Sequence, residues 1–331
     1  MKTILLAGGG GYIGTSMIKT FLAKGYTVKV IDNFIYNNFR PILGFTDNPD
    51  FYFYNRSMQD IKGNDPIFQD VDGVIVLGGL VGDPITKKYE ELSKQINDVA
   101  VKRFITACSG TNVRRLLFIS TCSNYGMLED GQFATEETKL NPLSHYAKQK
   151  VEIEQFIQTH QENFTFDTTV LRFATAFGLS PRMRFDLTVN EFARALALGQ
   201  PLEVYDADTW RPYCHVQDFS RLCEMVLLAD SALVSKQTFN AGGDANNHTK
   251  RDVVERIKKI VSNSNINFVD SSNDPRNYRV SFKKVRETLN FEPKFDINFG
   301  IMEILKYADM KIFIDDKKDP NLFGNYSVGG Q

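Results

Sequence analysis

The sequence predicts an α/β protein with a doubly wound parallel sheet, followed by a smaller mixed α/β part towards the C-terminus. Near-continuous apolar runs, typical of strands buried on both faces, alternate with segments whose apolar residues recur at helical spacing. Four consecutive glycines, residues 8–11, join the first such run to the first such helix. A chain of 331 residues can bury a large core in one or two tightly joined domains.

The individual elements are predicted from these patterns. The apolar runs expected to form the sheet are Lys2–Ala7, Thr27–Ile31, Phe51–Tyr54, Gly73–Leu77, Arg115–Ser120 and Thr168–Phe173. The helices expected between them are Tyr12–Lys24, Leu92–Cys108 and Tyr146–His160. After residue 173 the alternation breaks, and the expected elements are helices near Phe185–Leu198, His215–Leu228, 249–262 and 281–290, and strands at Leu202–Tyr205 and near 238–243. The polar tail, residues 315–331, is expected to be loosely ordered.

Composition excludes several classes of function. The formal charge is −1 with 24% charged residues, so the composition gives no sign of the basic surface that nucleic-acid binding requires. The four cysteines form no C-x-x-C pair, which favours reduced thiols in a cytoplasmic protein. No apolar stretch approaches the length of a membrane span, and the apolar start is too short for a signal peptide. No His, Cys or carboxylate cluster has the spacing of metal ligands, so no metal is expected.

The glycine run predicts a dinucleotide site. A strand, a glycine turn and a helix let backbone N–H groups and the helix N-terminus hold a pyrophosphate, because glycine allows the tight turn and the close approach. Two fingerprints are open at this point, one through Gly9, Gly11 and Gly14 and the other through Gly8, Gly11 and Gly14. Asp32 ends the second apolar run, 18 residues after Gly14. An acid there accepts hydrogen bonds from ribose hydroxyls and repels a 2′-phosphate, which favours NAD over NADP.

Tyr146 and Lys150 are the candidate catalytic pair. At positions i and i+4 of a predicted helix they share one face. An ammonium near a phenol lowers a pKa that is ordinarily about 10, which makes the tyrosine a general base for a sugar hydroxyl. Thr121 follows the predicted fifth strand, at the carboxyl edge where α/β sheets bind ligands. Its hydroxyl would contact the same substrate oxygen.

Together these motifs resemble the extended short-chain dehydrogenase/reductase family, the NAD-dependent nucleotide-sugar epimerases and dehydratases, over nearly the whole chain. The resemblance selects the fingerprint through Gly8. It implies that NAD contacts Gly8, Gly11, Tyr12, Ile13, Gly14, Asp32, Asn33, Met58, Leu77, Gly78, Gly79, Tyr146, Lys150 and Phe173. Together with the arginines of segment 180–187, the resemblance also indicates a nucleoside-diphosphate sugar bound by Thr121, Thr175, Arg182, Arg184, Asn190, Arg211 and Arg276.

The resemblance also implies domains and an assembly. A Rossmann-type NAD-binding domain is expected over residues 1–175, with 212–243 returning to it. The substrate-binding domain is expected over residues 176–211 and 244–331. A homodimer is expected through the helices at 92–108 and 146–160.

The implied chemistry is oxidation of the sugar, usually at C4. Tyr146 takes the proton from the sugar hydroxyl, Lys150 tunes Tyr146 and binds the nicotinamide ribose, and Thr121 orients the hydroxyl. Hydride returned to the opposite face inverts the centre, so a 4-epimerase is the leading prediction. The alternative is a 4-dehydrogenase or 4-keto-sugar reductase of surface-polysaccharide biosynthesis, with a GDP-heptose-like substrate. A remote alternative is an NAD-binding regulator without catalysis.

Departures from the family pattern narrow the choice. Dehydratases carry Asp-Glu directly after the active-site threonine, and Cys122 and Ser123 stand there instead, so 4,6-dehydration is not expected. Cys122 is one place from the catalytic cysteine of the epimerase/reductases and is expected to be a small buried thiol. Two differences, at Val81 and Thr175, separate the chain from the UDP-galactose epimerases.

The most individual segment is 180–187, which carries Arg182 and Arg184. Two arginines outside the cofactor half can clamp substrate phosphates. The alternative is a solvated helix start in which Asp186 pairs with a neighbouring arginine.

Overall fold

The computed structural model describes residues 1–261, 265–270, 276–313 and 320–329. A seven-stranded sheet lies at its centre, with the order β11-β7-β5-β4-β1-β2-β3 and every neighbouring pair parallel. Its strands are β1 (Thr3–Ala7), β2 (Thr27–Asp32), β3 (Phe51–Asn55), β4 (Gly73–Val76), β5 (Arg115–Thr121), β7 (Asp167–Phe173) and β11 (Gln237–Ala241). The strand order reverses between β1 and β4, which is the switch point of a doubly wound sheet. The predicted fold class is confirmed.

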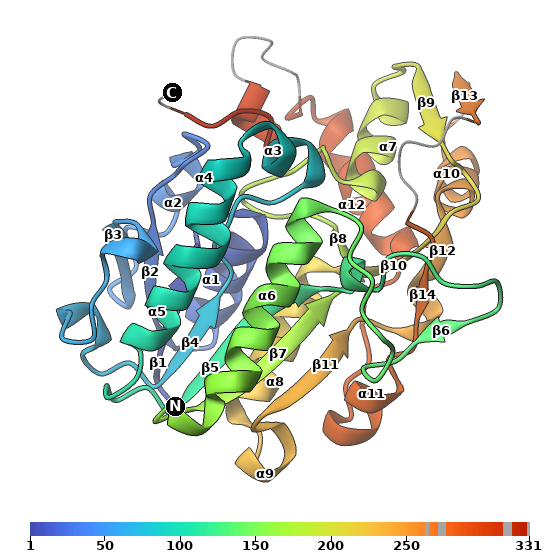
Figure 1. Ribbon diagram of the computed structural model, residues 1–331. Coiled ribbons are helices and arrows are strands. Elements are labelled where there is room, and N and C mark those ends of the chain that lie inside the picture. Colours follow the sequence, from blue (N-terminus) through green and yellow to red (C-terminus); the bar gives the residue numbers. More distant parts are fainter. Residues whose placement is uncertain (262–264, 271–275, 314–319, 330–331) are drawn as a thin grey trace.

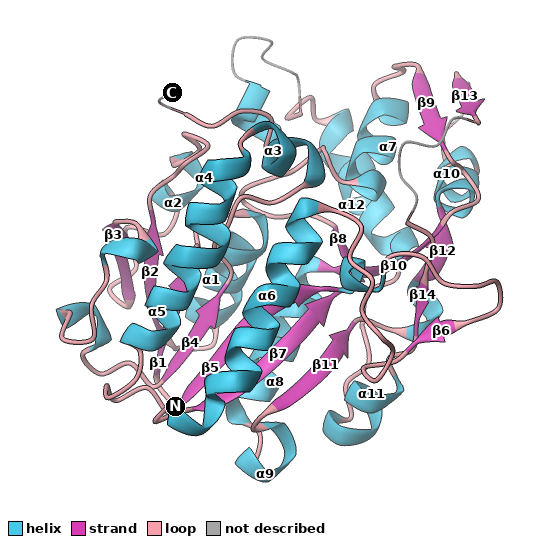
Figure 2. Ribbon diagram, in the orientation of Figure 1, coloured by secondary structure: helices cyan, strands magenta, loops and turns pink. Residues whose placement is uncertain are grey.

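Helices cover both faces of this sheet (Figure 1). Figure 2 shows the resulting layers, with the magenta strands between cyan helices. The described helices are α1 (Tyr12–Ala23), α2 (Arg40–Leu43), α3 (Asp83–Lys88), α4 (Glu90–Lys94), α5 (Val101–Ala107), α6 (His145–His160), α7 (Thr188–Ala197), α8 (Val216–Leu228), α9 (Ser231–Val234), α10 (Lys250–Lys258), α11 (Lys283–Leu289) and α12 (Ile297–Asp309). A π-helical turn, Gln95–Ala100, joins α4 to α5.

Alternate residues along each central strand face opposite layers, because side chains of a strand point to alternate sides. In β1, Leu6 packs into the core that contains Phe21 of α1, whereas Leu5 packs into the core that contains Phe104 of α5. Both leucines are fully buried. This two-sided burial is why these strands read as continuous apolar runs.

Beyond β7 the chain builds a second core beside the carboxyl ends of the sheet. The described residues form three small sheets besides the central one. The first contains β12 (Asn247–Thr249), β10 (Trp210–His215) and β8 (Thr175–Phe177), and the second pairs β13 (Ile266–Val269) with β9 (Leu202–Tyr205). The third pairs β14 (Arg279–Val280) with β6 (Phe133–Ala134), which precedes β7 and packs with the core of the central sheet. Helices α7, α10 and α12 contribute Phe192, Val253 and Ile301 to one apolar cluster. A cleft lined by both parts results, at the ends of the parallel strands.

Some predicted elements are wrong. The helix expected from Phe185 begins at Thr188, because residues 185–187 form a bend that ends in Leu187 with extended backbone angles. Helix α12, missed from the sequence, begins at Ile297 and is capped by Asp296, whose carboxylate accepts a hydrogen bond from the N–H of Phe299. The helix expected over 249–262 ends at Lys258, and residue 262 lies outside the described residues.

The prediction of a loosely ordered tail is also wrong for residues 321–329. Asn321 is 6% exposed and hydrogen-bonds to Tyr36, Tyr326 and Ser327, which hold the segment against the sheet domain. Residues 315–319 and 330–331 of the predicted tail lie outside the described residues.

Within the described ranges, no helix is long and apolar enough to cross a membrane. Nor do the described side chains include a group of three or more His, Cys, Asp or Glu residues that could hold a metal ion.

Candidate active site

One large cavity of about 1070 Å³ lies at the carboxyl ends of the parallel strands. It exceeds the roughly 300–1,000 Å³ of a pocket for one small ligand. Its lining includes every residue predicted to contact NAD and six of the seven predicted to contact the substrate. The exception is Asn190, which is fully buried beside the cavity and hydrogen-bonds to the N–H of Gly178 and the hydroxyl of Tyr12.

The glycine turn after β1 is shaped for close approach. Gly8 has φ +83°, and a Cβ on it would lie 2.2 Å from the Cα of Gly78. A Cβ on Gly14 would lie 2.4 Å from the carbonyl oxygen of Gly9, so α1 packs directly on the turn. A Cβ on Gly9 would meet Val30, and Gly9 is absent from the cavity lining. The residues that reach the cavity are therefore those of the fingerprint through Gly8, Gly11 and Gly14.

Asp32 closes this turn from the end of β2. Its Oδ2 accepts a hydrogen bond of 2.8 Å from the N–H of Gly10, and its Oδ1 accepts one of 2.8 Å from the N–H of Phe34. Burial raises the pKa of Asp32, and the backbone hydrogen bonds oppose that shift. Each oxygen keeps a second lone pair for a ribose hydroxyl. The glycine turn leaves room for a pyrophosphate against the backbone, and Asp32 can accept hydrogen bonds from a ribose. Both features fit a dinucleotide.

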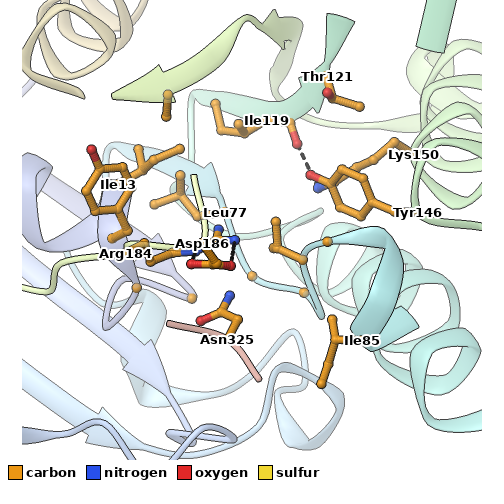
Figure 3. A pocket seen from close by; sticks show the side chains of 18 of the residues that line it. Ile13, Leu77, Ile85, Ile119, Thr121, Tyr146, Lys150, Arg184, Asp186 and Asn325 are labelled. Atoms are coloured by element: carbon orange, nitrogen blue, oxygen red, sulfur yellow. Dashed lines mark hydrogen bonds and ion pairs between the residues drawn. The ribbon is translucent and has the colours of Figure 1, made fainter. Parts of the chain in front are cut away.

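Three predicted catalytic residues lie together at one end of the cavity (Figure 3). Thr121 ends β5, and its Oγ1 accepts a hydrogen bond of 3.1 Å from the N–H of Ser123, so its own O–H can donate to a substrate. Tyr146 and Lys150 lie on the first two turns of α6, where Ser144 caps the helix through the N–H of Ala147.

Burial sets the protonation of this pair. The Lys150 Nζ donates a hydrogen bond of 2.8 Å to the carbonyl oxygen of Ile119 and lies 5.7 Å from the centre of the Tyr146 ring. Burial lowers the pKa of Lys150 to about 8. Burial also raises the pKa of Tyr146, against the positive charge of Arg184. The sequence predicts that Lys150 lowers the pKa of Tyr146, whereas in this structure burial raises that pKa and the opposing positive charge is that of Arg184.

Across the cavity, Arg184 and Asp186 form a two-point ion pair (Figure 3). Nε bonds to Oδ1 at 3.0 Å and Nη2 to Oδ2 at 2.6 Å. Burial works against the ionised acid, but the charge and hydrogen bonds of Arg184 lower the pKa of Asp186. The structure thus shows the pairing that was the alternative to a phosphate clamp, yet both side chains also line the cavity.

Arg182 faces the cofactor half of the cavity. Its segment lies on α1, because Ser180 Oγ donates to the carbonyl oxygen of Tyr12 at 2.6 Å and the Arg182 N–H donates to Thr15 Oγ1 at 3.3 Å. Its guanidinium donates to Asn325 Oδ1 at 2.6 Å. Burial, followed by the charge of Arg184, lowers the pKa of Arg182 to about 10.

Arg211 and Arg276 lie near one another, on the substrate side. The Arg211 guanidinium donates to the carbonyl oxygen of Arg276 at 2.5 Å and lies 5.3 Å from the centre of the Tyr278 ring. Arg276 pairs with Asp83 at 2.8 Å. The Tyr278 hydroxyl lies 3.2 Å from Ser123 Oγ, beside the active-site threonine.

Sequence reasoning missed several lining residues. They are Tyr36, Asp83, Tyr278, Asn325 and Tyr326. A usable signal existed only in the tail, where the apolar Phe323, Tyr326 and Val328 interrupt a polar composition.

Cys122 has the buried position that the sequence predicts. It is 1% exposed, and its thiol donates to the carbonyl oxygen of Arg172. Burial raises the pKa of this thiol, which keeps it protonated.

Comparison with known proteins identifies the family. The family model described as "NAD dependent epimerase/dehydratase family" matches residues 4–242. The chain belongs to this family. The prediction of an NAD-dependent enzyme of the extended short-chain dehydrogenase/reductase type is confirmed.

Among related family members is the low-salt glycan biosynthesis protein Agl12 of Haloferax volcanii, 24% identical over 92% of this chain and 97% of its own length. The uncharacterized UDP-glucose epimerase YtcB of Bacillus subtilis is 25% identical, over 92% of this chain and 97% of its own length.

Solved structures share the fold. UDP-glucuronic acid 4-epimerase from Bacillus cereus, in complex with UDP-glucuronic acid and NAD, superposes with a TM-score of 0.83 at 22% identity, over 93% of this chain and 99% of that chain. UDP-glucose 4-epimerase from Thermotoga maritima, with UDP-glucose, gives a TM-score of 0.81 at 21% identity, over 94% of this chain and 99% of that chain.

Proposed function

We propose that this protein oxidises C4 of a nucleoside-diphosphate sugar with NAD and returns the hydride to the opposite face, as a nucleotide-sugar 4-epimerase. One observation carries the proposal. Thr121, Tyr146 and Lys150 lie at one end of the same cavity whose other wall is the glycine turn with Asp32. A proton acceptor for a hydroxyl and a dinucleotide site therefore share one cavity.

Each residue has a role in this proposal. Tyr146 takes the proton from the O4 hydroxyl, which the O–H of Thr121 orients through a hydrogen bond. The Lys150 ammonium, held by the carbonyl oxygen of Ile119, stabilises the phenolate that must form from a tyrosine with a raised pKa. When bound, NAD supplies the acceptor and store of the hydride.

The other side of the cavity supports an anionic substrate. Arg211 and Arg276 are candidates for its diphosphate, and Thr175 lines the same cavity. The chain carries Cys122 and Ser123 where an acid–base pair would follow the threonine, and the Cys122 thiol is buried. Elimination of water is therefore not proposed.

The second candidate is net oxidation or reduction at C4 by the same residues, including a GDP-heptose-like substrate. The relationship to a glycan biosynthesis protein supports a place in surface-polysaccharide synthesis. A regulator without catalysis would not need the intact trio of Thr121, Tyr146 and Lys150.

The test is a screen of UDP-, GDP-, CDP- and dTDP-sugars, read by NMR of the sugar ring together with the absorbance of NADH. A 4-epimerase converts one sugar nucleotide to its C4 epimer with no net NADH. Stoichiometric NADH with a keto sugar would instead establish the dehydrogenase. Binding of NAD without turnover of any sugar nucleotide in the screen would count against both enzymes.

Three further predictions accompany this proposal. Residues 1–175 with 212–243 bind the cofactor, and 176–211 with 244–331 bind the substrate. The protein acts in the cytoplasm, and it forms a homodimer through the helices at 92–108 and 146–160.

The apolar side chains of these helices, such as Phe104 and Ile153, are buried against the sheet, so a dimer would form through their polar outer faces. Light scattering tests the dimer.

A further inference from the structure

We propose that residues 321–329, here termed the C-terminal strap, cross the dinucleotide cavity and keep NAD bound from one turnover to the next. The inference rests on the proposed use of NAD, and it deepens that function by stating when the cofactor leaves.

The strap begins at Asn321, whose side-chain amide hydrogen-bonds to several backbone groups. Its side-chain N–H₂ donates to the carbonyl oxygens of Tyr36, at 3.1 Å, and Ser327, at 2.7 Å. Its Oδ1 accepts from the N–H groups of Tyr326 and Ser327 at 3.0 and 3.1 Å. Asn38 adds a hydrogen bond of 2.8 Å to the carbonyl oxygen of Asn321. One buried amide therefore fixes the bend of the strap and joins it to the loop after β2.

Phe323 anchors the same end in the second core. Its ring lies 5.5 Å from Phe185 and 5.9 Å from Phe313, edge to face in both cases. The N–H of Phe185 also donates to the Phe323 carbonyl oxygen at 2.7 Å. The strap is thus tied to the segment that carries Arg184.

The far end is fastened on the cofactor side. The N–H of Gly329 donates to the carbonyl oxygen of Ile35 at 2.7 Å. Val328 is 7% exposed and packs in a cluster with Leu80 and Ile85. These two residues follow β4, whereas Ile35 follows β2.

The position of these anchors decides the argument. Strands β2 and β4 are the two neighbours of β1 in the sheet. A segment held by the loops after both of them spans the end of β1, where the glycine turn and the start of α1 lie. Figure 1 shows the red C-terminal segment running across this end of the molecule near α3.

The middle of the strap forms part of the cavity wall. Asn325 and Tyr326 line the cavity, and Arg182 donates to Asn325 Oδ1 at 2.6 Å and to the Gly324 carbonyl oxygen at 3.0 Å. Arg182 also contacts Thr15 in the first turn of α1. A dinucleotide on the glycine turn would therefore lie under the strap, and its release would need the strap to detach.

This arrangement has a functional consequence. An epimerase recovers its hydride within each cycle and can keep one NAD indefinitely. A net dehydrogenase must exchange NADH for NAD at every turnover, so a closed strap would limit its rate. A strap that slows the exchange of NAD is therefore compatible with an epimerase and would hinder a net dehydrogenase.

The experiment measures exchange of radiolabelled NAD, bound to the full chain, against excess unlabelled NAD. Two variants open the strap. A chain ending at Gly324 removes residues 325–331 and keeps Phe323 in its apolar contacts. Asn321→Ala removes the hydrogen bonds of the Asn321 side-chain amide without altering a residue that lines the cavity. Asn247→Ala is the matched control, because Asn247 is a buried asparagine that pins another segment through Val280 and lies outside the cavity lining.

We expect each strap variant to release NAD at least about tenfold faster than the full chain, since several hydrogen bonds are lost and tenfold corresponds to about 1.4 kcal/mol. The control variant should exchange like the full chain. Unchanged exchange in Asn321→Ala would overturn the strap proposal while leaving the proposed function intact, and this variant decides alone if the shortened chain does not fold. Failure of the full chain to bind NAD would overturn both.

Discussion

The side chain of Lys150 donates a hydrogen bond to the backbone carbonyl of Ile119, with 2.8 Å between Nζ and O. This bond ties the active-site helix α6 to strand β5 at the point where Thr121 follows. It places a buried ammonium beside the Tyr146 ring, and the charge state of that ammonium is the first property to test.

Lys150 should titrate near pH 8, well below an ordinary lysine at about 10.4. Below pH 8 it is charged in both the folded and unfolded chains, so its desolvation penalises the folded state in full. Between about 8 and 10.4 only the unfolded chain holds the proton, so the contribution of this group to stability rises with pH. The ¹³Cε shift of Lys150, assigned with Lys150→Arg, measures the midpoint in the protein before and after NAD is added. A midpoint above 10 in the protein without NAD would contradict the burial argument.

Tyr146→Phe should reduce kcat by about 10²–10⁴-fold, because the general base is lost while the ring is kept. NAD content should stay unchanged. Turnover is measured by NMR on the sugar nucleotide identified in the screen, and NAD by release on denaturation. Tyr205→Phe is the control, since Tyr205 is exposed on β9 and lies outside the cavity lining. Activity that survives Tyr146→Phe would refute the assigned role.

Gly8→Ala should destabilise the protein by about 2–4 kcal/mol and abolish co-purified NAD. The new methyl group would meet the Gly78 backbone, which adds overpacking to the strain of a positive φ. Chemical denaturation measures the stability.

Gly25→Ala is the control for Gly8→Ala. Gly25 has φ +80°, but nothing lies within 4 Å of its added Cβ. It should cost only the backbone strain, about 1–2 kcal/mol, and keep NAD bound. Equal losses in the two variants would show that the close approach to Gly78 has no importance.

Asp186→Asn should lower the free energy of unfolding by about 3–5 kcal/mol, because the buried Arg184 loses its ionised partner. The pKa of Asp186 is lowered in the folded chain, so its contribution is present above the ordinary value of about 3.9 and is lost as the pH falls through the folded value. Urea unfolding between neutral and acidic pH measures both effects.

Asp208→Asn is the control for Asp186→Asn. Asp208 forms the same kind of two-point pair with Arg251, but in the open. Its stability should hardly change, since solvent screens an exposed pair. If Asp186→Asn behaves in the same way, the cavity pair makes no special contribution.

The central sheet and the first wall of the site could be predicted from the sequence for a local reason. Strands buried on both faces give continuous apolar runs, and the glycine turn, Asp32 and the Tyr146–Lys150 pair are short-range patterns. Strand β10 was missed because it contains Arg211 and Pro212, which interrupt an apolar run.

The tail was mispredicted because its order depends on distant partners. Asn321 hydrogen-bonds to Tyr36, 285 residues away in the sequence, and Arg182 reaches Asn325 across 143 residues. The polar residues that make these contacts carry no local sign of them, and only the apolar Phe323, Tyr326 and Val328 indicate that the tail packs. The same limit hid Tyr36 as a lining residue.

The bond between Asn321 and Tyr36 also bears on how the protein assembles. Closing a loop between residues so far apart costs chain entropy before any contact is gained, so we expect this contact to form after those of the main sheet. The main sheet can therefore be complete before the strap settles over it. NAD that is retained only beneath a settled strap should slow unfolding and leave the folding rate unchanged, so that the cofactor stabilises the finished enzyme and does not guide its folding.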